Sequence, residues 1–170
     1  MSYWFRGNAY HSLGQYEQAI QDFDKGIRLD PNDSWAYNDR GSSYDNLGQH
    51  QRAIQDYDVA IQLDPNYPTV YYNRGNAYKN LGQFQRAIQD YDEAIRLDLD
   101  SRAAYANRGI AYGSLGQHQQ AIQDFDVAIQ QDPSDASAYH NRGISYFNLG
   151  KYADANADEA NACSLDSQLC

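Results

Sequence analysis

The sequence has few basic residues, few cysteines and no long apolar run, and each shortage excludes a class of protein. Lysine and arginine together number 13 against 23 aspartates and glutamates, so the net charge is −10. That is the wrong sign for a chain that binds phosphates by releasing counterions, so we expect no nucleic acid partner. No run reaches the roughly 18 apolar residues of a transmembrane helix, so no membrane insertion is predicted.

Catalytic and metal-binding patterns are also missing. The sequence contains neither a phosphate-binding G-x-x-x-x-G-K loop nor a G-x-S-x-G motif, and both carry specific chemistry. His11 and His140 lie far apart without a matching cluster of ligands, while His50 and His118 alternate with aromatic residues at equivalent positions. We therefore expect no enzyme activity, no metal and no cofactor.

What the sequence does contain is a repeat of 34 residues. Its 170 residues equal five such periods, and a 34-residue period is typical of helical solenoids. Four columns recur without a break at this spacing. They are Gly7, Gly41, Gly75, Gly109, Gly143; Tyr10, Tyr44, Tyr78, Tyr112, Tyr146; Ala19, Ala53, Ala87, Ala121, Ala155; and the Leu-Gly pairs that end at Gly14, Gly48, Gly82, Gly116, Gly150.

Each repeat is predicted to form two helices. In the second repeat, small and apolar residues fall at helical spacing first over 37–47 and again over 53–61. Gly48 stands where a left-handed residue would end the first helix, and Pro65 ends the second. Small residues at Gly41 and Ala53 would let the two helices approach closely.

These columns resemble the tetratricopeptide repeat family over the whole chain, as five units of roughly 1–33, 34–67, 68–101, 102–135 and 136–169. The resemblance implies an all-α fold, a right-handed superhelical solenoid of antiparallel helix hairpins whose first helices line a concave groove. It also implies a surface for binding peptides or proteins rather than catalysis. Leu99 departs from the pattern, because it replaces the closing proline of the third unit.

The two ends of the array differ. In the fifth unit Asn156 and Glu159 replace an isoleucine column and an aromatic column, which suits a last repeat that has no successor to pack on. At the other end, Trp4 and Phe5 occupy the positions of Asn38 and Asp39. Either further repeats precede these rings or the rings contact a partner, and they are a candidate edge for self-association.

Arginine and aspartate also recur once per repeat. Arginine directly precedes the helix-packing glycine, and aspartate recurs in the second helix although it is a poor helix former. We interpret the two columns as an intramolecular ladder of ion pairs; an acidic docking face is the alternative. The residues are Arg6, Arg40, Arg74, Arg108, Arg142 and Asp22, Asp56, Asp90, Asp124, Asp158, with Asp24, Asp58, Asp92 and Asp126 two residues further on.

The candidate binding site is the face of the first helices opposite the packing tyrosines. An asparagine side chain both donates and accepts hydrogen bonds, so one amide per repeat could hold an extended peptide backbone. The resemblance implies the same role, since some members of the family hold peptides with stacked asparagines; the alternative is that these amides are structural. The candidate residues are Asn73, Asn107, Asn141, Asn76 and Asp39, beside the aromatic Trp35, Tyr72 and Phe147.

We therefore predict a protein-interaction scaffold that binds an extended peptide or a partner helix. A structural unit that assembles through Trp4 and Phe5, or a regulatory domain of a larger protein, is the alternative. Another branch of the family clamps chaperone tails with groove lysines, but here Lys79 is nearly alone in positive charge.

The compartment depends on the cysteines. A continuous helix would hold Cys163 and Cys170 about 10 Å apart along its axis, too far for a disulfide. A bridge requires the last helix to end soon after Cys163, which Asp166-Ser167 permits. The compartment is left open, with the cytoplasm favoured, and a bridge would favour an extracytoplasmic location instead.

Overall fold

The computed structural model describes residues 3–97 and 102–170, and this part of the chain contains α-helices, one short 3-10 helix (η1) and no strand. The predicted all-α fold is confirmed. The helices are α1 Tyr3–Ser12, α2 Tyr16–Leu29, α3 Ser34–Asn46, α4 His50–Leu63, α5 Pro68–Asn80, α6 Phe84–Leu97, α7 Arg102–Ser114, α8 His118–Gln131, α9 Ala136–Asn148, α10 Tyr152–Leu165 and η1 Ser167–Leu169.

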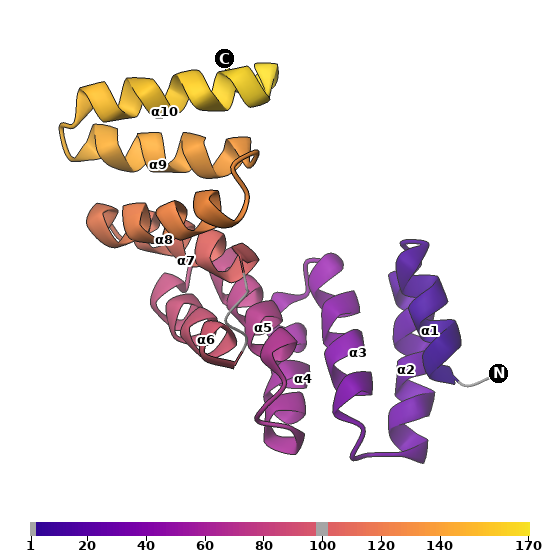
Figure 1. Ribbon diagram of the computed structural model, residues 1–170. Helices are drawn as coiled ribbons and strands as arrows, with labels where there is room; N and C mark the ends of the chain where they lie inside the picture. The colour runs from indigo at the N-terminus through magenta and orange to yellow at the C-terminus, as the bar shows by residue number, and fades with distance from the viewer. Residues whose placement is uncertain (1–2, 98–101) are drawn as a thin grey trace. The chain divides into compact units, whose positions relative to one another are not determined.

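The helices belong to two compact units, each of which contains more than one repeat. Met1–Gln83 is called the first unit from here on, and Phe84–Cys170 the second unit. In the first unit α1 packs on α2, α3 on α4, and each of α3 and α5 also packs on the helix before it. The second unit repeats this scheme with α6 to α10, and Figure 1 shows α9 and α10 lying side by side. Successive first helices also touch, α1 with α3, α3 with α5, and α7 with α9.

Glycine ends the first helix of every repeat, as predicted. The five glycines after the leucines have φ between 70° and 74°, the left-handed region in which side chains are strained. In the second repeat Gly48 has φ 73°, and the N–H of Gln49 bonds back to the Tyr44 carbonyl at 2.9 Å. The chain therefore leaves the first helix and enters the second by the same turn in each repeat.

A second glycine column lets the two helices of a hairpin pack closely. A Cβ placed on Gly41 would lie 2.8 Å from the ring of Tyr57, and one on Gly7 would lie 2.7 Å from Phe23. Such distances are too short for real contacts, so an aromatic ring of the second helix occupies the space that glycine leaves. Phe23, Tyr57 and Phe125 are almost completely buried there.

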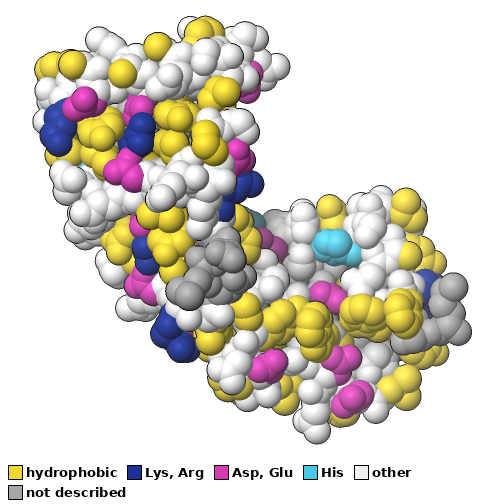
Figure 2. Space-filling view, in the orientation of Figure 1, with side chains coloured by type: hydrophobic (Ala, Val, Ile, Leu, Met, Phe, Trp, Pro, Cys, Tyr) yellow, Lys and Arg dark blue, Asp and Glu magenta, His cyan; other side chains and the backbone are white. Residues whose placement is uncertain are grey.

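The arginine and aspartate columns form the predicted ladder. Arg108 donates from Nε and Nη2 to Asp124 at 2.8 and 2.6 Å, and from Nη1 to Asp92 of the preceding helix at 2.6 Å. Arg108 thus ties its own hairpin to the one before it. The same two-sided bond is made by Arg40 with Asp56 and Asp24 and by Arg142 with Asp158 and Asp126, and Figure 2 shows basic and acidic side chains side by side on the second unit.

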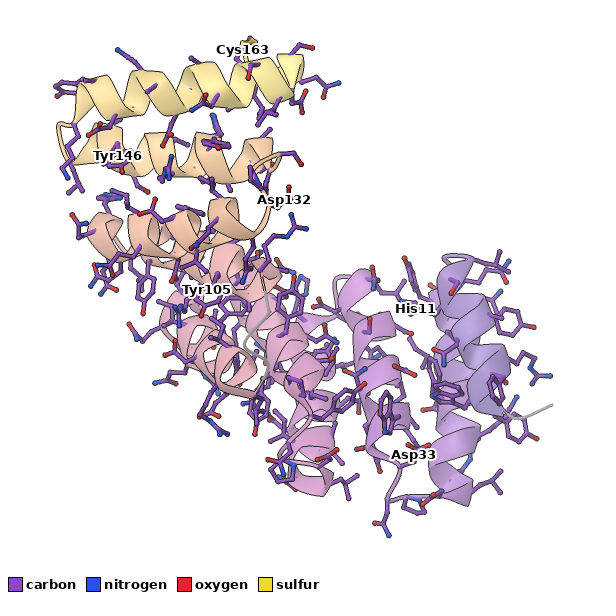
Figure 3. The ribbon with its side chains drawn as sticks, viewed as in Figure 1. His11, Asp33, Tyr105, Asp132, Tyr146 and Cys163 are labelled. Atoms are coloured by element: carbon purple, nitrogen blue, oxygen red, sulfur yellow. A yellow bond between two sulfur atoms is a disulfide. The ribbon has the colours of Figure 1, made fainter. Side chains whose placement is uncertain are left out.

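The polar face predicted for the last helix is present, because Asn156 and Glu159 are both exposed on α10. α10 ends at Leu165, η1 follows, and a disulfide joins Cys163 to Cys170 with their Cα atoms 4.9 Å apart (Figure 3). The helix thus stops early enough for the bridge to form. Leu99 lies outside the described residues. None of the helices in the described ranges has the length and apolar character needed to cross a bilayer.

Candidate protein-interaction surface

The first helices of the first unit are joined by polar side chains at the face predicted to bind peptides. Asn73 on α5 donates from Nδ2 to the Oδ1 of Asn38 on α3 at 3.0 Å. Asn38 itself is 4% exposed and also donates to Asp39 at 3.0 Å. The Asn73 amide, predicted to hold a ligand backbone, is therefore already engaged in holding two neighbouring repeats together.

Asp39 is likewise occupied by groups of its own chain. The indole N–H of Trp4 on α1 donates to Asp39 Oδ2 at 2.9 Å. Burial raises the pKa of Asp39 above its ordinary value, while the hydrogen bonds from Asn38, Asn8 and Trp4 act in the opposite direction. Asp39 is thus a partly buried acceptor between two helices rather than an open binding group.

Trp4 and Phe5, the two rings at the N-terminal edge, differ in solvent exposure and in bonding. Trp4 is half-buried and bonded to Asp39, whereas Phe5 is 65% exposed and meets the Trp4 ring edge-on at 5.0 Å. The open edge predicted from both rings is therefore reduced to Phe5. His11, which points from α1 towards α3 in Figure 3, lies 2.9 Å from the hydroxyl of Ser43, and burial lowers its pKa.

In both units, exposed aromatic rings are present on helices that come first in their repeat. In the first unit, Trp35 at the start of α3 is 54% exposed and lies 4.6 Å from the ring of Tyr67. In the second unit, Phe147 on α9 is 62% exposed and meets the ring of Tyr152 edge-on at 5.4 Å. Each ring is held by an aromatic neighbour and still presents about half of its surface to solvent.

Two asparagine amides of the second unit bond to their own helix. Asn141 donates from Nδ2 to the Ser137 carbonyl at 2.8 Å, and Asn148 donates in the same way to Ile144. Such bonds occupy one donor of each amide and leave the other donor for further use. Tyr72, Asn76 and Asn107 are half-buried.

A pocket of about 230 Å³ opens between the helices of the second unit, and the predicted site residue Asn141 lines it. The other lining residues are not among the candidate site residues predicted from the sequence. They are Gly109, Ile110, Gly113, Ser114, His118, Phe125, Ile144, Ser145 and Asn148. Within the described residues, no group of three or more histidines, cysteines and carboxylates is placed to hold a metal ion.

The ladder arginines of the second unit lie against tyrosine rings. The guanidinium of Arg108 lies 5.3 Å from the centre of the Tyr105 ring and 5.9 Å from that of Tyr112. Arg142 lies 5.4 Å from Tyr139 and 5.9 Å from Tyr146, and Figure 3 labels Tyr105 and Tyr146. Cation–π contact and ion pairing therefore both direct the arginines into the packing between helices.

Solved structures with this arrangement of helices are similar over nearly the whole chain. A crystal structure of MamA shares 26% identity and has a TM-score of 0.89, with 95% of each chain covered. MamA 41-end from Desulfovibrio magneticus RS-1 shares 21% identity with a TM-score of 0.91, covering 98% of this chain and 94% of that one. YrrB, described as a TPR protein with an unusual peptide-binding site, shares 23% identity with a TM-score of 0.85, covering 98% and 87%.

Family models match most of the sequence. The model described as TPR repeat matches residues 7–48, 44–82 and 111–150, and models described as tetratricopeptide repeat match 68–100 and 136–165. No curated protein sequence shows significant similarity to the chain. The repeated columns, the helical hairpins and these matches agree, and the chain belongs to the tetratricopeptide repeat family.

Proposed function

We propose that the chain is a non-catalytic scaffold that binds an extended peptide or a partner helix along its first helices. The observation that carries the proposal is the exposure of large apolar side chains on those helices beside polar amides. Trp35 is 54% exposed, Ile144 47% and Phe147 62%. A few large side chains that become buried in pockets supply most of the binding energy at protein interfaces, with tryptophan among the most frequent, and polar groups beside them fix the orientation of a peptide backbone.

Similarity to YrrB supports the same function, since that protein is described as having a peptide-binding site. Not all three of the asparagines predicted to bind a peptide backbone are assigned that role, however. Asn73 already bonds to Asn38, so we assign ligand binding to Asn141, which keeps one amide donor, together with the exposed rings.

The test is a selection of peptides from a random twelve-residue library, followed by fluorescence anisotropy with the peptides obtained. Phe147→Ala should weaken binding about tenfold or more, because truncating an anchoring ring commonly costs about 2 kcal/mol. The matched control is Leu165→Ala, which removes an apolar side chain of 45% exposure from the end of α10. Equal binding by both variants would remove the second unit from the binding surface.

A second candidate function rests on Phe5. An exposed ring at the edge of a repeat array could pack against another copy of the chain. Sedimentation at rising concentration tests this: Phe5→Ser should leave a self-associating protein monomeric. A chain that is monomeric with Phe5 intact would eliminate this candidate.

The disulfide supports a location outside the cytoplasm. Bridges between cysteines form and persist in oxidising compartments and are rare where thiols are kept reduced. We therefore propose an extracytoplasmic location. Mass spectrometry of protein taken from its native compartment tests this proposal, and two free thiols there would overturn it.

A further inference from the structure

One position near the end of the first helix lies five residues before the start of the second helix in each repeat. In the repeats compared below it holds His11, Asp45, Gly113 and Phe147. In the first repeat the His11 ring meets Tyr16 edge-on at 5.2 Å, and in the fifth Phe147 meets Tyr152 at 5.4 Å. In the second repeat Asp45 accepts a hydrogen bond from His50 Nδ1 at 2.6 Å. Three repeats therefore fill this position with a side chain that contacts the residue five places further on.

The fourth repeat keeps the histidine and lacks its partner. His118 is the equivalent of His50, but Gly113 stands where Asp45 stands in the second repeat. Among the buried side-chain nitrogens and oxygens of the described residues, His118 Nδ1 is left without a hydrogen-bond partner. A buried polar atom in this state is unusual, since protein interiors pair such groups almost without exception.

The missing side chain also makes room. Gly113 and His118 both line the pocket of about 230 Å³, and a Cβ placed on Gly113 would have only the Ser145 hydroxyl within 4.0 Å. Ile144, Ser114 and Asn148 lie at the rim and are exposed. The pocket is therefore open to a group from outside at the point where the second repeat supplies its own carboxylate.

We propose that this pocket receives a carboxylate of a bound peptide, which pairs with His118 Nδ1 as Asp45 pairs with His50. The inference rests on the proposed peptide-binding function and names the group that the second unit recognises. The carboxylate comes from an aspartate or glutamate side chain or from the C-terminus of the peptide, and the experiment below separates these sources.

The other side chains of the pocket fit this role. Of the described residues that line it, none is acidic, so nothing there repels an entering carboxylate. The hydroxyls of Ser114 and Ser145 donate to carbonyls of their own helices at 2.9 and 3.1 Å. Ile110 and Ile144 supply apolar walls for the methylene groups that precede a carboxylate. Asn141 and Asn148 each use one amide donor within their own helix, and His118 Nδ1 is the buried polar atom of the lining that has no hydrogen-bond partner.

The experiment compares two forms of each peptide selected on the unmodified chain. We expect an acidic residue or a free C-terminus at one fixed place in these peptides. Changing that glutamate to glutamine, or amidating that terminus, should weaken binding about tenfold, the loss typical of a hydrogen bond to a charged group. Whichever of the two changes has the effect identifies the source of the carboxylate.

Variants of the chain assign the effect to His118. His118→Phe places in the fourth repeat the residue that the third repeat has at Phe84, so the fold should be kept and the two peptide forms should bind equally. The matched control is His50→Phe, the same change where Asp45 already fills the position, and it should leave the tenfold difference intact. Gly113→Asp should supply an internal carboxylate to His118, so that the acidic and neutral peptide forms bind equally. The same variant should melt at a higher temperature than Gly113→Ala.

Failure of this inference is distinct from failure of the proposed function. If peptides bind and Phe147→Ala weakens them, but the acidic and neutral forms bind alike, the carboxylate assignment is wrong. If no peptide is selected, N-acetylglutamate is titrated while the ring signals of His118 are followed by NMR. Shifts that N-acetylglutaminamide, which carries no carboxylate, does not produce would support the pocket, and their absence would overturn it.

Discussion

The indole N–H of Trp4 and the carboxylate of Asp39 form a 2.9 Å hydrogen bond between the first helices of two successive repeats. The bond gives Trp4 a structural role, because Asp39 is largely withdrawn from water and needs donors. Its neighbours Asn38 and Asn8 supply others. The junction between the first two repeats is therefore polar where the predicted groove runs over it.

Trp4→Phe should lower the free energy of unfolding of the chain by about 1–2 kcal/mol. The change keeps an aromatic ring and removes one hydrogen bond to a charged, partly buried group. Urea unfolding followed by circular dichroism measures the loss. Phe5→Ala is the control, since that ring is 65% exposed and should change the unfolding free energy by less than about 0.5 kcal/mol. Equal losses in both variants would contradict this account.

The charge on Asp39 should make stability depend on pH. Burial raises its pKa, so the folded chain binds this proton more tightly than the unfolded chain, whose aspartates titrate near about 3.9. Stability is then favoured where Asp39 is protonated and declines as the pH rises through its raised pKa. Asp39→Asn removes this dependence. The free energy of unfolding of the variant minus that of the unmodified chain should increase from about pH 4 to pH 7. A constant difference would show that the hydrogen bonds cancel the effect of burial on this pKa, and a falling one that they outweigh it.

The elements of the fold could be predicted because each depends on residues within one repeat. Gly41 and Gly48 mark a close helix contact and a left-handed helix end, and both requirements are local. The ion pairs could also be predicted, because arginine and aspartate recur in fixed columns. The ion pairs of Arg40 and of Arg142 each join residues 16 places apart in the sequence.

The candidate site was harder to predict, since its side chains pair across neighbouring repeats. Trp4 with Asp39 and Asn73 with Asn38 are each 35 residues apart, one more than the repeat length. Each contact joins one repeat position to the next position in the following repeat. Comparing residues at the same position of every repeat does not reveal such a contact. The pocket at Gly113 did leave a trace in the sequence, because His50 follows an aspartate by five residues and His118 follows a glycine at the same interval.

Arg108→Ala should destabilise the chain strongly. Arg108 is 17% exposed and Asp124 6%, so the change leaves a buried carboxylate without its partner and releases the tie to Asp92. Breaking a buried pair from one side costs about 3 kcal/mol or more. Asp92→Asn is the matched control on the same arginine: Asp92 is 51% exposed, and exposed pairs contribute about 0–1 kcal/mol. Similar losses in the two variants would show that the ladder derives its stability from somewhere other than burial.

Removal of the disulfide should increase local unfolding at the C-terminal end of α10 and leave the other helices of the second unit unchanged. The bridge from Cys163 to Cys170 closes a short loop that contains the end of α10 and η1. Loop-closure entropy for so short a segment gives an upper limit of about 2–3 kcal/mol. Cys163→Ser with Cys170→Ser should therefore speed hydrogen exchange in the last turn of α10 while amides of α7 and α8 keep their protection, because those helices contact neither cysteine's loop. Reducing the unmodified chain with dithiothreitol should reproduce this pattern, and the same reductant should have no effect on the double variant. Lost protection in α7 or α8 would mean that the bridge stabilises the second unit as a whole.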